Sequence, residues 1–263
     1  MTDEVLGPRS SALTHLRRLS GRRRARLDAG QFVIDGPTLV AEALAAGADV
    51  VEVYAEPGAP EEVLAAARAA GVVVRAVEAG ALAKVTSPVT PQPVAALASL
   101  PRPAGDEVLR GLVLVLVGVA DPGNAGTLVR VAEAAGASAV VSCADAVDLW
   151  NPKSVRASAG SSFRVPILVA GGIDAALRRL RGAGMIVVAT AADATVALDD
   201  ADLRGDVALL LGNEAHGLPP GVVAAADVAV RIPMAGRVES LNVAMTGTVL
   251  AFESARQRRV APR

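Results

Sequence analysis

The sequence predicts an α/β protein built of two units, and two observations lead to this fold class. Apolar residues make up 52% of the 263-residue chain but aromatic residues only 2%, so Ala, Val and Leu must fill the cores, as in parallel sheets covered by helices. Short apolar runs also alternate with helix-like stretches along most of the chain, which is typical of parallel sheets with helices on both faces. A chain of this length can form two modest cores.

The first unit is expected at residues 1–104. Its predicted elements, in chain order, are a helix at 8–27, a strand at 31–35, a helix at 37–46, a strand at 50–54, a helix at 60–70, a strand at 72–75 and an apolar run at 94–100. Pro37 favours a helix start because proline suits the first helical turn. The Pro-containing polar stretch 101–107 then interrupts the pattern, so we place the domain boundary near residue 104.

The second unit, residues 105–263, repeats the alternation of strands and helices. Its predicted strands lie at 111–118, 138–141, 185–190, 207–211 and 227–231, and its predicted helices at 124–136, 172–182 and 240–257. This order predicts one parallel sheet with helices on both faces.

Composition excludes several classes of protein. Cys143 is the only cysteine and the chain has two histidines, so neither a disulfide framework nor a Cys/His zinc site fits. The longest apolar runs, such as 112–120, are about half of the roughly 20 residues that a membrane helix needs. No apolar signal core follows the arginines near the N-terminus. We therefore expect a reduced, soluble, cytoplasmic protein that holds no metal.

The N-terminal segment is basic, although the whole chain has a net charge of −1. Residues 1–31 hold seven arginines against three acidic residues, and Arg22, Arg23 and Arg24 are consecutive. Clustered arginines suit an arm that contacts RNA phosphates. The same residues also fit a solvated amphipathic helix with leucines on its buried side, and the two interpretations are compatible.

Three polar segments that contain glycine and asparagine follow apolar runs of the second unit. They are Asp121–Arg130, Leu211–Gly217 and Ile232–Val243. Ligands of open α/β sheets bind beyond the carboxyl ends of the strands, so these segments can converge on one pocket. Their glycine spacing matches neither the dinucleotide fingerprint nor the phosphate loop of nucleotide-binding proteins.

The first segment contains an Asn-x-Gly-x-x-x-Arg pattern from Asn124 to Arg130. Asn124 suits the N-cap of a helix, and a cap alone would explain it. Arg130 lies on a helix otherwise composed of Leu, Val and Ala, where a buried guanidinium needs an acidic or phosphate partner. We therefore favour a functional role for Arg130.

The other two segments place further polar groups at strand and helix ends. Glu214 follows a predicted strand, and His216 is a candidate general base because imidazole changes charge near neutral pH; an ordinary turn is the alternative. Ser240 and Asn242 open the last helix, where Ser240 fits an N-cap and the free amides suit an anion. No nucleophile elbow accompanies Ser240, so a hydrolase triad is unsupported.

A fourth stretch, residues 151–166, combines Lys153, Arg156 and Arg164 with small hydroxyl residues. Cations and hydroxyls together can bind phosphate. A surface helix followed by a turn explains the same residues equally well.

Taken together, the patterns Asn124-x-Gly-x-x-x-Arg130, Gly212-Asn-Glu-x-x-Gly217 and Ile232-Pro-Met-x-Gly-x-x-x-Ser-Leu-Asn-Val243 resemble the three motifs of the SpoU (TrmH) family of RNA ribose 2′-O-methyltransferases. The motifs stand in the family's order, and the similarity covers residues 111–257. The segment at 152–164 resembles the subgroup that acts on ribosomal RNA. Residues 32–43 resemble the family's L30e-like substrate-binding domain, with Asp35 where the family usually has Glu.

This resemblance implies an α/β fold with a SPOUT-type parallel sheet and a C-terminal trefoil knot, preceded by a smaller L30e-like domain that binds RNA. It also implies S-adenosyl-methionine as methyl donor, no metal, and a homodimer with the active site near the subunit interface. The cofactor-binding residues that it implies are Thr190, Ala191, Leu211, Gly212, Asn213, Glu214, Ile232, Pro233, Met234, Ser240, Leu241 and Asn242. The expected RNA-binding residues are Arg22, Arg23, Arg24, Lys153, Arg156 and Arg164.

The catalytic residues that the resemblance implies are Asn124, Arg130, Glu214, Ser240 and Asn242. The reaction is an in-line displacement in which orientation can supply up to about 7–11 kcal/mol. Family precedent places Arg130 near the target phosphate and hydroxyl and proposes it as the base. Because arginine stays protonated in proteins, we expect Arg130 instead to orient the hydroxyl and stabilise negative charge, with Glu214 holding it.

Ribosomal RNA is the expected substrate, and transfer RNA is the alternative. A non-catalytic RNA-binding protein with the same fold is a further alternative. An idle pocket has no chemical need for Arg130, Glu214 and Asn242 together, which favours the enzyme. The low aromatic content predicts that RNA is held by shape and phosphate contacts more than by base stacking.

Overall fold

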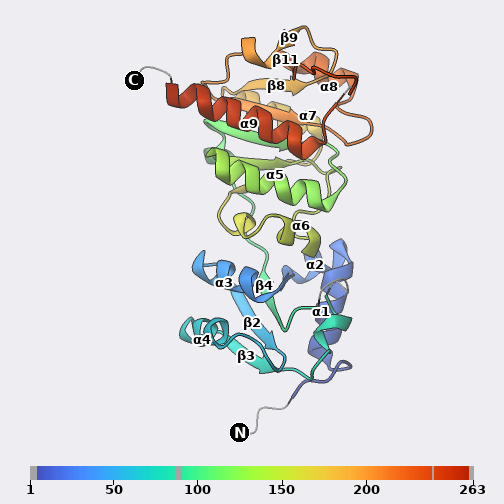
Figure 1. Ribbon diagram of the computed structural model, residues 1–263, viewed down its shortest axis with the longest axis vertical. Coiled ribbons are helices and arrows are strands. Elements are labelled where there is room, and N and C mark those ends of the chain that lie inside the picture. The colour runs from blue at the N-terminus through green and yellow to red at the C-terminus, as the bar shows by residue number, and fades with distance from the viewer. Residues whose placement is uncertain (1–4, 87–90, 239, 261–263) are drawn as a thin grey trace. The chain divides into compact units, whose positions relative to one another are not determined.

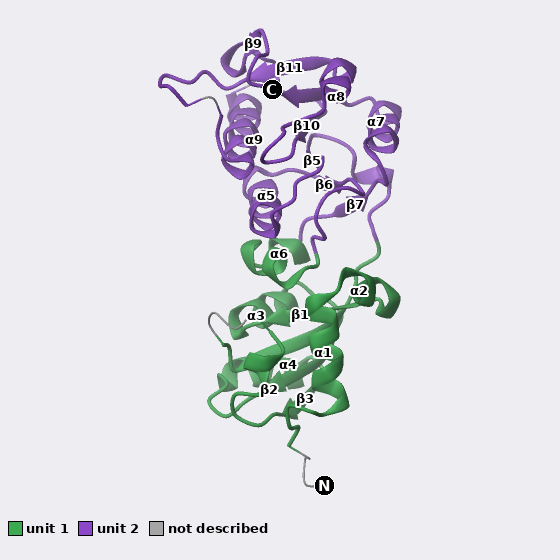
Figure 2. Cartoon of the chain, turned by 90° about the vertical axis from the view of Figure 1, so that its right-hand side faces the viewer, with its two compact units in different colours: residues 1–102, 150–163 green, residues 103–149, 164–263 purple. Residues whose placement is uncertain are grey.

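The computed structural model describes residues 5–86, 91–238 and 240–260. The chain forms two compact units, residues 1–102 with 150–163 and residues 103–149 with 164–263 (Figure 2). The chain first passes from one unit to the other between residues 102 and 103, close to the predicted boundary at residue 104. However, the prediction of one continuous second domain is wrong for 150–163, because this segment packs into the first unit.

The first unit contains a four-stranded mixed sheet with the strand order β1-β4-β2-β3. Its strands are β1 (Gln31–Asp35), β2 (Val50–Ala55), β3 (Val73–Ala76) and β4 (Val94–Ser99), and its helices are α1 (Ser11–Gly21), α2 (Arg23–Ala29), α3 (Pro37–Ala45), α4 (Glu61–Ala69) and α6 (Pro152–Ala157). Strand β4 runs antiparallel to β1 and β2, whereas β2 and β3 are parallel. The sheet is therefore mixed and not purely parallel.

The helix predicted at residues 8–27 is two helices, because Arg22 has an extended backbone that ends α1. Arg26 then turns inward, is buried, and donates a hydrogen bond to the Leu19 carbonyl at the end of α1. The neighbouring Arg22, Arg23 and Arg24 stay exposed. The N-terminal basic cluster is therefore divided between a structural arginine and solvent-facing ones.

The second unit contains a seven-stranded sheet in the order β7-β6-β5-β10-β8-β11-β9. Its strands are β5 (Leu112–Leu116), β6 (Ala139–Ser142), β7 (Ile167–Val169), β8 (Ile186–Thr190), β9 (Val196–Ala197), β10 (Val207–Leu211) and β11 (Val228–Arg231), and its helices are α5 (Pro122–Ala135), α7 (Ile173–Gly182), α8 (Pro220–Ala225) and α9 (Val243–Val260). All neighbouring strands are parallel, so the parallel sheet predicted for this unit is confirmed.

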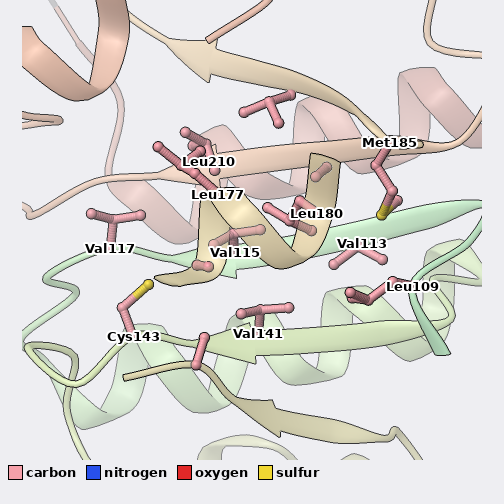
Figure 3. Close-up of a cluster of buried hydrophobic side chains, with 14 of the residues drawn as sticks. Leu109, Val113, Val115, Val117, Val141, Cys143, Leu177, Leu180, Met185 and Leu210 are labelled. Atoms are coloured by element: carbon pink, nitrogen blue, oxygen red, sulfur yellow. The ribbon is translucent and has the colours of Figure 1, made fainter. Parts of the chain in front are cut away.

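Helices cover both faces of this sheet (Figure 1). On one face, Val113, Val115 and Val141 of the central strands pack against Leu177 and Leu180 of α7 (Figure 3). Helices α5 and α9 contact β5 on the other face and pack against each other. In the described part of the chain, no helix combines the length and hydrophobicity of a membrane span.

Candidate active site

A cavity of about 600 Å³ lies in the second unit where three neighbouring strands end. Strand β8 lies between β10 and β11 in the parallel sheet, so the loops that follow these strands emerge at one edge. These loops and the first turns of α8 and α9 form the walls. The volume is typical of sites for small molecules and cofactors.

The second and third polar segments both reach this cavity. Of the residues expected to bind cofactor, those that line it are Thr190, Ala191, Gly212, Asn213, Glu214, Ile232, Met234, Ser240 and Leu241. Leu211, Pro233 and Asn242 are not among the lining residues, and Leu211 is fully buried in β10. The second and third segments thus converge on this cavity, while no residue of Asp121–Arg130 is among its lining residues. The contact of each residue with a cofactor stays a prediction.

Some lining residues lie outside the sequence motifs. Val223 and Ala224 of α8 and Leu250 of α9 add an apolar wall. Asp193 and Arg231 add opposite charges at the ends of the adjacent strands β8 and β11. The two charged residues stand close to predicted cofactor residues in the sequence, so extending the motifs would have found them. The apolar residues carry no comparable signal.

The loop after β10 has a tight backbone that explains its glycines. The N–H of Asn213 donates to the Gly217 carbonyl at 3.0 Å, and the N–H of Gly217 donates back at 2.9 Å. A Cβ atom at Gly212 would overlap the backbone of Gly217 and Leu218, and Gly217 has a positive φ of 64°. Both positions therefore need glycine, and the loop holds Glu214 at the strand end.

A chain of side-chain hydrogen bonds joins the three polar segments. Asn242 donates through Nδ2 to Oδ1 of Asn124 at 3.1 Å, and Asn124 donates through its own Nδ2 to Oε1 of Glu214 at 2.9 Å. Glu214 also accepts hydrogen bonds from the backbone N–H groups of Ala120 and Asp121, each at 3.0 Å. These residues are far apart in the sequence but form one connected network.

The network keeps Glu214 ionised. Partial burial acts to raise the pKa of Glu214, but the hydrogen bonds from Asn124, Ala120 and Asp121 together lower it below the ordinary value of a glutamate. A carboxylate with this many donors is a good anchor for the start of α5 and a weak base.

The helix caps differ from the predicted ones. Asp121, not Asn124, caps α5 by accepting a hydrogen bond from the Asn124 N–H at 2.9 Å. Asn242, not Ser240, accepts from the Ala244 N–H at 2.8 Å at the start of α9. The Asn124 and Ser240 side chains are therefore available for other contacts, and Asn124 uses both ends of its amide in the network.

Arg130 is exposed on α5, so the need of a buried guanidinium for an acidic or phosphate partner does not apply to it, and its functional role stays a prediction. It lies eight residues after Pro122, which corresponds to about 12 Å along the helix axis. Among the described residues, no ion pair joins Arg130 to Glu214, whose side chain holds Asn124 instead. Among the described residues of one chain, Arg130 thus takes no part in the hydrogen-bond network of Asn124, Glu214 and Asn242.

The basic residues of the fourth stretch have protein partners. Arg156 forms a 3.0 Å ion pair with Asp35, whose side chain is buried. Burial raises the pKa of Asp35, and the positive charge of Arg156 and the Thr86 hydroxyl reduce this effect. Arg164 forms an ion pair with Glu133. The structural explanation therefore holds for Arg156 and Arg164, while contacts of these residues and of Lys153 with RNA stay predictions.

Comparison with known proteins gives consistent matches over both units. The SpoU rRNA Methylase family matches residues 111–252, and the MRM3-like substrate binding domain matches residues 12–96. A 23S rRNA (guanosine-2′-O-)-methyltransferase, RlmB, of Ralstonia nicotianae is 41% identical over 60% of this chain and 65% of that protein. The protein of the same name from Xanthomonas axonopodis pv. citri is 38% identical over 87% of this chain and 97% of its own length.

A solved structure also matches nearly the full chain. The SpoU methyltransferase AviRb from Streptomyces viridochromogenes, in complex with the cofactor AdoMet, has a TM-score of 0.88 and 27% identity. The match covers 97% of this chain and 100% of that chain.

Proposed function

The chain belongs to the SpoU rRNA methylase family, and we propose that it transfers a methyl group from S-adenosyl-methionine to a ribose 2′-hydroxyl of ribosomal RNA. The observation that carries this proposal is the network of Asn242, Asn124 and Glu214, which joins the three family motifs. The network meets the cavity at Glu214, so one preorganised site contains all three motifs.

The residues that line the cavity fit S-adenosyl-methionine. The apolar wall from Val223, Ala224 and Leu250 suits an adenine ring, and Asp193 and Arg231 suit hydroxyl and charged groups at the other parts of the molecule. The glycine at 212 keeps the loop free of a side chain there. When bound, the cofactor supplies a methyl group activated by a positively charged sulfur.

The chain's own residues position the reacting groups. Glu214 fixes the Asn124 amide, and Asn124 in turn accepts from Asn242, which also caps α9. Helix α9 and the loop before it are therefore held at one edge of the cavity with Ser240 on its lining. Such fixed polar groups lower the reorganisation that a displacement reaction needs.

The first unit supplies features for binding RNA. Arg22, Arg23 and Arg24 are exposed at the junction of α1 and α2 and can contact phosphates. The relatives of Ralstonia and Xanthomonas carry the name of 23S rRNA guanosine methyltransferases. We therefore propose large-subunit ribosomal RNA as the substrate, with transfer RNA as the alternative, and we propose a cytoplasmic location.

A second copy of the chain is proposed as partner. Met245, Val249 and Phe252 are exposed by 59%, 40% and 42%, and their spacing of four and three residues places them along one side of α9, with Leu241, exposed by 37%, just before the helix begins. Such a stripe suits an isologous dimer. In a dimer, Arg130 on the adjacent helix α5 can serve its partner's cavity, which would account for its absence from the network at Glu214. A trefoil knot at the C-terminus is part of the same proposal.

The experiment incubates the purified protein with tritium-labelled S-adenosyl-methionine and, separately, unmodified 23S ribosomal RNA and transfer RNA. Nuclease digestion and mass spectrometry then locate the label. We expect methyl transfer to one ribose 2′-oxygen of 23S RNA. Label on transfer RNA alone would show that transfer RNA, and not ribosomal RNA, is the substrate. Binding of RNA without any transfer of methyl groups would favour the non-catalytic alternative.

A further inference from the structure

We infer that His216 accepts the proton of the ribose 2′-hydroxyl, a role that rests on the proposed function. His216 is exposed, lines the cavity, and lies in the same tight loop as Glu214. The transfer reaction needs a group that takes up this proton, and the amide and hydroxyl side chains of the three motifs have no basic atom for it.

The orientation of Asn213 determines which nitrogen of His216 carries hydrogen. Asn213 Nδ2 donates to the Gly118 carbonyl at 2.8 Å, and Asn213 Oδ1 accepts from the backbone N–H groups of Ala215 and His216 at 2.9 and 3.2 Å. In the reverse amide orientation, the NH₂ group of Asn213 would face the N–H groups of Ala215 and His216, and its oxygen would face the Gly118 carbonyl. Oδ1 therefore faces the His216 ring, and its partner Nδ1, 3.1 Å away, must be the protonated nitrogen.

This hydrogen bond leaves Nε2 of neutral His216 with a lone pair. The ring is held by Asn213 through Nδ1, while Nε2 makes no hydrogen bond to the described residues and belongs to an exposed side chain. A base oriented through one ring nitrogen and open at the other is the arrangement that general-base histidines use.

The other titratable groups around the cavity are less suited. Among the described residues that line it, these are Asp193, Glu214 and Arg231. Glu214 already accepts three hydrogen bonds, which lower its pKa, and arginine stays protonated. Asp193 is exposed, and a carboxylate is ordinarily a weaker base than imidazole. His216 is thus the best placed acceptor near neutral pH.

The proton transfer balances as follows. The 2′-hydroxyl proton moves to Nε2 of neutral His216, which becomes an imidazolium. The oxygen uses its electron pair for the new bond to the methyl carbon, and the electrons of the broken carbon–sulfur bond stay on sulfur. The titratable groups that share the cavity with His216 are Asp193, Glu214 and Arg231, and Asp145 lies close to Gly118, whose carbonyl accepts from Asn213.

The test compares single-turnover methyl transfer across pH 5 to 9 for wild type, His216→Asn and His15→Asn. The asparagine amide at 216 can still donate to Asn213 at the place of Nδ1 but lacks a basic atom. We expect its rate to fall roughly 100-fold or more and to lose the decline that protonation of the base causes at acid pH. Calorimetric affinity for S-adenosyl-methionine is expected to stay within about twofold of wild type. His15 lies in the first unit and bonds to Gln31, so His15→Asn serves as the matched control.

Nitrogen NMR of the histidine-labelled protein provides a readout that is independent of activity. The structure gives the two histidines opposite tautomers, because Arg18 donates to Nδ1 of His15 whereas Nδ1 of His216 donates to Asn213. We expect hydrogen on Nδ1 of neutral His216 and on Nε2 of neutral His15. The spectrum of His15→Asn assigns the signals.

Three results would overturn the inference: hydrogen on Nε2 of neutral His216, a rate for His216→Asn within twofold of wild type, or loss of the acid decline in Asp193→Asn instead. A wild-type protein that methylates no RNA would contradict the proposed function, whereas the tautomer would still test the geometry of His216.

Discussion

Asn124 connects the site because both ends of its amide are used. Its NH₂ group donates to Glu214, and its oxygen accepts from Asn242. Asp at this position would have the same shape but would place a carboxylate against the Glu214 carboxylate. Like charges at hydrogen-bond distance raise the pKa of one partner. This single change therefore replaces an attractive contact between residue 124 and Glu214 with a repulsive one.

Asp35 gives a prediction about stability and pH. Because burial raises its pKa in the folded state, the stability that protonated Asp35 contributes is lost as pH rises through that value. Asp35→Asn is expected to remove this pH dependence. Arg156→Met leaves the buried carboxylate without its 3.0 Å partner and is expected to cost up to about 3 kcal/mol, more at pH 8 than at pH 5.

Denaturant unfolding followed by the fluorescence of Trp150, the only tryptophan, measures both variants in the unit that contains them. If the free energy of unfolding had the same pH dependence in Arg156→Met and wild type, the ion pair with Arg156 would not control the ionisation of Asp35.

Single residues show what the sequence could and could not predict at the site. The motifs predicted functional roles for Asn124, Glu214 and Asn242, but the mutual hydrogen bonds of these residues join positions 90 and 118 residues apart, which local patterns do not encode. The same limit explains why Glu214 was assigned to Arg130. Cap choice among neighbouring polar residues also failed, because Asp121 and Asn124 are both good N-caps and only the backbone decides.

At the scale of elements, strands with continuous apolar runs were predicted well, and three other short elements were missed. Strands β1 and β10 have the predicted bounds, whereas β7 and β9, with three and two residues, and the six-residue α8 were not predicted. The mixed sheet of the first unit was missed because strand direction depends on pairing across the unit.

The segment at 150–163 is the main difference in domain organisation. Trp150 and Phe163 pack around Phe32 of β1, with ring centroids 4.8 and 6.4 Å from it, and Val155 joins the same core. Three of the five aromatic residues of the chain therefore gather in one place. Charge in this segment left phosphate contacts and a surface helix with a turn as equal alternatives, and neither indicated the apolar anchors that fix the segment.

Trp150→Ala is expected to destabilise the first unit by about 2–3 kcal/mol, because it leaves a gap beside Phe32. Hydrogen exchange of β1 amides measures the effect, and Leu27→Ala, at a side chain 60% exposed in the same unit, is the control without effect. Faster exchange in β6 with unchanged β1 would contradict the assignment of the segment to the first unit.

At the scale of the molecule, the α9 stripe predicts assembly. Phe252→Glu is expected to convert a dimer to a monomer, because it places a charge in an apolar contact. If Arg130 serves the partner's cavity, the rate of methyl transfer falls when the dimer dissociates. Light scattering after gel filtration measures the mass. Val73→Glu, which changes an exposed valine of the first unit, is expected to stay dimeric.

A monomeric wild type, or a dimer that persists in Phe252→Glu, would show that this stripe is not the contact between copies.

The most direct measurement is the calorimetric titration of S-adenosyl-methionine into wild type, Asn124→Asp and the control Asn151→Asp. Asn151 caps α6 through its side-chain oxygen, a role that Asp fills equally well. We predict one site per chain in wild type, the same affinity in Asn151→Asp, and at least roughly tenfold weaker binding in Asn124→Asp, because the network at Glu214 is lost. Absence of binding in wild type, or equal affinity in all three proteins, would contradict a cofactor site organised by the three joined segments.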